Sequence, residues 1–67
     1  MTLKERRENL GLLQEDVANQ LEVDQSTISN WERGRSIPYR KFAVKLAALY
    51  KCSVDEILKS NGFDVKK

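Results

Sequence analysis

The chain has 67 residues and a mass of 7.7 kDa, which is enough for one domain and no more. Charged residues make up 33% and apolar residues 40%, a composition typical of a folded domain with a net charge of only +2. One cysteine and no histidine exclude an internal disulfide and leave almost no ligands for a structural zinc site. Because so small a core supplies about 3–5 kcal/mol, regular helix packing or self-association must add to it.

The residue inventory argues against an enzyme. No histidine is available for proton transfer near neutral pH, and Cys52 therefore lacks a histidine partner. We expect Cys52 to act as a small buried apolar residue, and we expect no metal, cofactor or small-molecule ligand. Apolar runs are too short to cross a membrane, and the first residues lack the apolar stretch of a signal peptide. These features predict a cytoplasmic protein without a membrane partner.

Two helices are expected in the first third of the chain. Thr2 and Glu5 have the spacing of a capping box, which predicts a helix from Leu3 to about Leu10. Gly11 then suits the left-handed conformation that often follows a helix. The apolar stripe of the next segment predicts a second helix from about Gln14 to Leu21; its members are Val17, Ala18 and Leu21.

A third helix is predicted after a break of three residues. Asp24 is a suitable N-cap for a helix that runs to about Arg33, and Gly34 is its stop signal. Ile28 and Trp31 are three residues apart and mark the buried side.

Two more helices complete the expected fold. One fits Tyr39 to Tyr50 after the loop that contains Pro38, and Ser53 with Glu56 repeats the capping-box spacing before a short last helix. No strand pattern is present, so we predict an all-α bundle of five helices over residues 1–62 and a tail over 63–67.

The charge is unevenly distributed along the chain. Residues 15–24 carry four acids and no base, whereas residues 33–51 carry six basic residues and no acid, namely Arg33, Arg35, Arg40, Lys41, Lys45 and Lys51. A one-signed block in so short a chain indicates a surface that faces a polyanion, although a solvated helix face would show the same block.

The outer face of the third predicted helix consists almost entirely of amide and hydroxyl groups. Its members are Gln25, Ser26, Ser29, Asn30 and Arg33, with Thr27 at the edge. Such residues are weak helix formers, so a purely structural surface would favour Glu, Lys and Ala instead. The same groups bond to base edges in the DNA major groove. This composition favours base reading over an incidental polar face.

These residues carry a family resemblance over about five sixths of the chain, from Leu3 to Leu58. The sequence resembles the lambda-repressor-like (Cro-like, XRE) helix-turn-helix family in an ordered set of motifs: GLLQEDVA at 11–18, QSTISNWERG at 25–34, LA at 46–47 and VDEIL at 54–58. The resemblance implies a five-helix bundle in which the second and third helices form the helix-turn-helix and the third enters the major groove.

The resemblance also implies roles for particular residues. Base contacts would come from Gln25, Ser26, Thr27, Ser29 and Asn30. Phosphate contacts would come from Gln14, Asn30 and Arg35, and from Tyr39 or Arg40, with Gln14 also packing against Gln25. Arg33, which opens the basic block, is a further phosphate-contact candidate. An ion pair between Arg7 and Glu32 would join the first helix to the third.

Three residues depart from the family pattern. Leu13 stands where a capping Ser, Thr or Asn is usual, and Glu22 and Lys51 stand where Gly is common. If the backbone at Glu22 needs a positive φ, the side chain strains it by about 1 kcal/mol. None of the three is expected to face DNA, so the departures bear on stability.

We therefore expect a sequence-specific regulator that binds double-stranded DNA, of the phage-repressor type found in bacteria and phages. A repressor is favoured over an activator because occupying a promoter requires only binding. A single reading helix selects too few base pairs, so a homodimer on a palindromic operator is expected. Candidate interface residues are Val54, Ile57, Leu58 and Phe63, of which the first three fit the internal core equally well. The alternative is an antitoxin-like or other protein-interaction module that uses the same surface.

Overall fold

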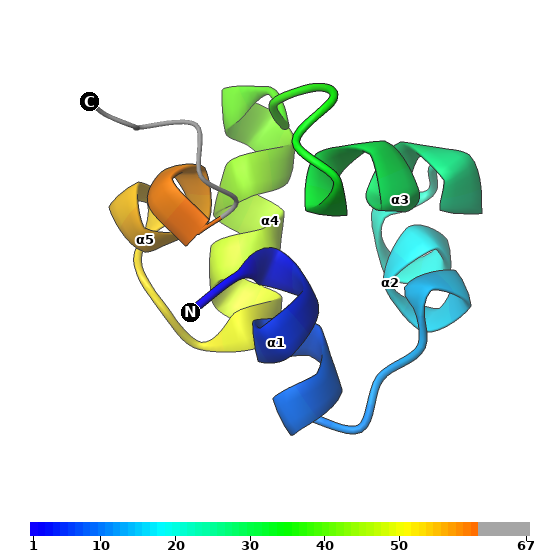
Figure 1. Cartoon of the computed structure of the whole chain (residues 1–67), viewed down its shortest axis with the longest axis horizontal. Coiled ribbons are helices and arrows are strands. Elements are labelled where there is room, and N and C mark those ends of the chain that lie inside the picture. The colour runs from blue at the N-terminus through cyan, green and yellow to red at the C-terminus, as the bar shows by residue number, and fades with distance from the viewer. Residues whose placement is uncertain (61–67) are drawn as a thin grey trace.

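Five helices and no strand make up the regular structure of residues 1–60, the part of the chain that the computed structural model describes (Figure 1). They are α1 (Leu3–Asn9), α2 (Gln14–Leu21), α3 (Gln25–Glu32), α4 (Arg40–Tyr50) and α5 (Val54–Ser60). The all-α prediction is confirmed, and the helix ends differ from the predicted ones by one residue or so. Within residues 1–60 no helix is long and apolar enough to cross a membrane.

The two capping boxes predicted from Ser/Thr–Glu spacing are both present. The backbone N–H of Glu5 donates to Thr2 Oγ1 at 3.1 Å, and the Thr2 N–H donates to Glu5 Oε1 at 2.8 Å. Ser53 and Glu56 repeat this arrangement at the start of α5, at 3.1 and 2.9 Å. The bond from the Thr2 N–H lowers the pKa of Glu5, and the bond from Ser53 lowers the pKa of Glu56.

The remaining helix ends show what the departures from the family pattern cost. Gly11 follows α1 with φ +71°, as expected, but Glu22 and Lys51 adopt φ of 60° and 61° after α2 and α4. Both are side-chain-bearing residues in the left-handed region, where Cβ crowds the following carbonyl. Leu13 offers no side-chain cap to α2, and the Asp24 carboxylate makes no capping bond at the start of α3. Asp24 is therefore the N-cap by position only.

The core lies where the five helices meet. It consists of Leu3, Val17, Ala18, Leu21, Ile28, Trp31, Ala43, Leu46, Ala47, Tyr50 and Ile57, all at most 7% exposed. The rings of Trp31 and Phe42 lie 5.5 Å apart and join α3 to α4. Cys52 is half-buried against this core, and burial raises the pKa of its thiol.

One interface residue expected from the sequence is a core residue. Ile57 is 0% exposed within its own chain, so it offers no surface to a second subunit. Val54 and Leu58 are half-buried beside it, while Phe63 and the predicted tail lie outside the described residues. A short helix with apolar residues on adjacent faces does not reveal from its sequence which face its own domain covers.

The packing pairs the helices so that one face of α3 stays uncovered. α2 packs on α3 across the turn at residues 22–24, and α4 packs on α5 (Figure 1). α1 also contacts α3. Ala18 of α2 is 2% exposed, and its small side chain lets α2 and α3 approach closely. Ile28 and Trp31 hold α3 from inside, and its polar residues are left on the outside.

Candidate nucleic-acid interface

The polar face of α3 is accessible and makes few contacts with the rest of the chain. Gln25 and Ser26 are exposed, and Thr27, Ser29 and Asn30 are half-buried. Within residues 1–60 the side chains of Ser26, Thr27, Ser29 and Asn30 take part in no hydrogen bond. Their donors and acceptors are therefore available to an external partner, which is what base reading requires.

Gln14 links the start of α2 to both ends of α3. Its Oε1 accepts a hydrogen bond from Gln25 Nε2 at 3.3 Å, so the contact that the resemblance implied is present. Its Nε2 donates to Glu32 Oε1 at 3.0 Å, a contact that sequence reasoning missed. Gln14 is half-buried at this junction, and its amide lies between the base-reading candidate Gln25 and the buried carboxylate of Glu32.

The ion pair expected between Arg7 and Glu32 lies directly behind this amide. Arg7 Nε donates to Glu32 Oε2 at 2.7 Å and Nη2 donates to Oε1 at 3.2 Å, while Nη1 donates to the Leu12 carbonyl at 2.9 Å. The two side chains are 9% and 5% exposed. The hydrogen bonds to Glu32 raise the pKa of Arg7. Burial raises the pKa of the nearby Tyr50, and the charge of Glu32 raises it further.

Four of the phosphate-contact candidates follow the C-terminal end of α3 along the chain. Arg33 follows the helix directly, and Arg35, Tyr39 and Arg40 continue through the loop into α4; all four are exposed. The loop is held against α3 because the Arg35 N–H donates to the Asn30 carbonyl at 2.9 Å. Tyr39, 75% exposed, precedes the first residue of α4. Arg33 and Arg35 thus lie close to the polar face, and Arg40 lies at the start of α4.

A hollow between α1, α2 and α3 adds one cation that sequence reasoning missed. It is lined by Lys4, Gln14, Ser29, Glu32 and Arg33. Lys4 precedes Arg7 by three residues, which places the two side chains on the same face of α1. Because the expected Arg7–Glu32 pair turns this face of α1 toward α3, the spacing of Lys4 and Arg7 could have placed Lys4 beside α3 from the sequence.

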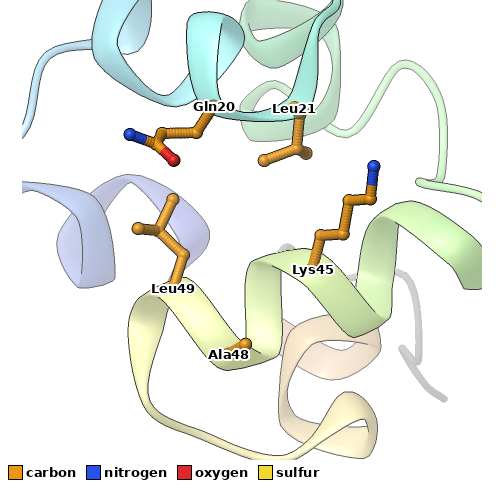
Figure 2. Close-up of a pocket in the computed structure, with 5 residues that line it drawn as sticks. All are labelled: Gln20, Leu21, Lys45, Ala48 and Leu49. Atoms are coloured by element: carbon orange, nitrogen blue, oxygen red, sulfur yellow. The ribbon is translucent and has the colours of Figure 1, made fainter.

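A second hollow lies on a different part of the molecule, between the last turn of α2 and the second half of α4 (Figure 2). Leu21 and Leu49 point into it, and Gln20, Lys45 and Ala48 complete its wall. The described lining contains a single ionisable group, Lys45, and none of the α3 residues considered for base reading. This hollow is separate from the polar face of α3.

Comparison with known proteins agrees with this geometry. Residues 3–57 match the helix-turn-helix family model. The chain is 36% identical over 56 residues to the HTH-type transcriptional regulator ImmR of Bacillus subtilis (strain 168). That match covers 84% of this chain and 44% of the relative, so the chain spans less than half of the relative's length. No solved structure gives a significant match. With its five helices and its exposed α3, the chain belongs to the helix-turn-helix family of DNA-binding transcriptional regulators, of the lambda-repressor-like (XRE) type.

Proposed function

We propose that this protein is a repressor that binds a palindromic operator as a homodimer, with α3 of each subunit in the major groove. The observation that carries the proposal is the outer face of α3. Its amides and hydroxyls are accessible and mostly unbonded, on a helix that Ile28 and Trp31 hold from behind at 1% and 4% exposure. A helix so anchored presents its polar groups in a fixed arrangement, and base reading depends on such an arrangement.

The base-reading residues of the proposal are Gln25, Ser26, Thr27, Ser29 and Asn30. Gln and Asn bond bidentately to adenine, hydroxyls bond to several base edges, and a Thr methyl contacts the thymine methyl. Gln25 and Ser26 stand at the N-terminal end of α3, the end that a recognition helix directs toward the bases. These residues supply sequence specificity.

The phosphate-contacting residues of the proposal are Gln14, Arg33, Arg35, Tyr39 and Arg40, together with Lys4. They lie at the start of α2, on α1 and after α3, so they bracket the reading face instead of occupying it. Contacts of this kind fix the register of a protein on the duplex and supply salt-dependent affinity.

The homodimer follows from the number of base pairs that one helix can read. Two copies related by a two-fold axis would read two half-sites about one helical turn apart. Val54 and Leu58, half-buried on α5, are the described residues that we place in the interface, with Phe63 beyond them. The apolar area they bury would also add to the stability of a small core.

Selection of bound DNA from a random duplex pool, followed by sequencing, tests the proposal. We expect an inverted repeat whose half-site centres are about 10 base pairs apart. Sedimentation of the free and bound protein should give one duplex for two chains. A non-palindromic consensus bound by one chain contradicts the homodimer. Enrichment of no sequence, with binding to proteins that persists at high salt, favours the interaction module instead.

A further inference from the structure

We propose that the buried Glu32 is a positioning residue that sets the polarity of the Gln14 and Gln25 amides and thereby the base that Gln25 reads. The proposal rests on the proposed function and deepens it. It starts from two hydrogen bonds, Gln14 Nε2 to Glu32 Oε1 at 3.0 Å and Gln25 Nε2 to Gln14 Oε1 at 3.3 Å. Together they form a chain from the buried ion pair to the outer surface of α3.

The polarity of this chain begins at the carboxylate. Glu32 is 5% exposed, and both oxygens of its carboxylate accept hydrogen bonds from the Arg7 guanidinium. An ionised carboxylate only accepts hydrogen bonds, whereas an amide presents an acceptor on one side and donors on the other. Gln14 must therefore turn its NH₂ group toward Glu32, and its carbonyl oxygen is turned toward Gln25.

The polarity then passes to the reading residue. Because Gln14 offers Oε1, Gln25 donates one of its two Nε2 hydrogens to it. Gln25 keeps its own Oε1 and one N–H for the groove. This acceptor–donor pair matches adenine, which offers a donor at N6 and an acceptor at N7. If the Gln14 amide were turned round, its NH₂ group would donate to Gln25 Oε1. The Gln25 NH₂ group would then be left for the groove, where it matches the acceptors O6 and N7 of guanine.

Parallel selections from the same random duplex pool test the inference with five proteins: the unchanged chain, Gln25→Ala, Glu32→Gln, Gln14→Ala and Glu8→Gln. The unchanged chain should select adenine at one position of each half-site, and Gln25→Ala identifies that position by losing the preference. Glu32→Gln replaces an obligate acceptor with an amide that fits either way round. Gln14→Ala removes the amide that connects Glu32 to Gln25 by hydrogen bonds. Both should lower the adenine-to-guanine ratio there by about tenfold. Glu8→Gln, the same chemical change on an exposed carboxylate of α1, should leave the ratio unchanged.

The design separates positioning from loss of structure. Glu32→Gln leaves the buried Arg7 without an ionised partner, so circular dichroism must show that the variant folds. Gln14→Ala keeps the Arg7–Glu32 pair intact and sustains the test if Glu32→Gln unfolds. Weaker binding to all sequences with an unchanged adenine-to-guanine ratio would show a purely structural role and overturn the inference. If the unchanged chain selects no consensus, the proposed function fails as well, so the two failures are distinguishable.

Discussion

Arg7 on α1 and Glu32 at the end of α3 form a two-point ion pair, with Nε–Oε2 at 2.7 Å and Nη2–Oε1 at 3.2 Å. The third arm of the guanidinium donates to the Leu12 carbonyl at 2.9 Å. Among the described residues, Arg7 is the one charged residue that is buried as a whole, at 7% exposed. Its guanidinium donates to two different segments, the end of α3 and the α1–α2 loop. The pair ties α1 and the α1–α2 loop to the helix that we assign to base reading.

Removing either partner of this pair should strongly destabilise the fold. We expect Arg7→Ala or Glu32→Ala to cost about 3–5 kcal/mol, because each leaves a buried charge unpaired. A core of this size supplies about the same amount, so either variant should be largely unfolded at room temperature. Replacing the pair by Met and Leu should recover most of the loss, since buried pairs exchange for apolar residues at little cost. Urea unfolding followed by circular dichroism measures all of these variants. Small, additive losses in the two single variants and the double Ala variant would show that the pair contributes little.

Glu22→Gly should raise the free energy of unfolding by about 0.5–1 kcal/mol. Glu22 has φ 60° after α2, and the left-handed conformation costs a residue with a Cβ about 1–2 kcal/mol. Glycine avoids this cost but loses more conformational entropy on folding, so only part of the strain energy is recovered. The Glu22 and Val23 N–H groups donate to the Asn19 and Ala18 carbonyls at 3.3 and 3.0 Å, and both bonds are backbone bonds that glycine retains. Glu22→Ala is the matched control and should bring no such gain, since alanine keeps the Cβ. A lower melting temperature for the glycine variant would contradict the strain at this position.

Alkaline pH should destabilise the protein through Tyr50. Burial, and then the charge of Glu32, raises the pKa of this phenol above its ordinary value of about 10. Below about pH 10 the phenol is protonated in both the folded and the unfolded protein, so its titration does not affect stability. Above this pH the unfolded chain loses the proton first, so the free energy of unfolding falls. Tyr50→Phe should flatten this decline. Both proteins should carry Cys52→Ala, because the thiol also has a raised pKa. Equal slopes of stability against pH for the two proteins would contradict the prediction.

The parts of the fold that short-range chemistry determines could be predicted from the sequence. Thr2 with Glu5 and Ser53 with Glu56 form their capping boxes within four residues, so their spacing alone locates the starts of α1 and α5. The polar face of α3 could be predicted for a similar reason, since Ile28 and Trp31 show which side is buried.

The parts that depend on tertiary packing could not be predicted in the same way. Ile57 belongs to the core because α4 covers that face of α5, and nothing in a seven-residue helix records which face is covered. The Gln14–Glu32 bond joins residues 18 apart, and Lys4 borders α3 only because Arg7 anchors α1 to Glu32. Such contacts follow from how the helices are placed and have no local pattern.

Loss of one arginine that we propose to contact phosphate should weaken DNA binding without changing the selected sequence. If a dimer contacts about six phosphates, log affinity should fall with log salt at a slope near −5. Arg35→Ala or Arg40→Ala removes one contact per subunit, so we expect the slope to become less steep by about 2 for the dimer. The consensus should stay the same, because phosphate contacts carry no base information.

The matched comparison is Gln25→Ala, which removes a proposed base contact on the same surface. Its salt slope should equal that of the unchanged protein, while discrimination at one position of each half-site falls by about 1–3 kcal/mol. Fluorescence anisotropy with a labelled operator over a range of salt concentrations measures both quantities. Both arginines are exposed and make no ion pair within residues 1–60, so their removal should leave the fold intact. An unchanged slope of log affinity against log salt in both arginine variants would show that neither arginine contacts phosphate. Lys4 and Arg33, which line the hollow beside Gln14, would then be the next residues to replace.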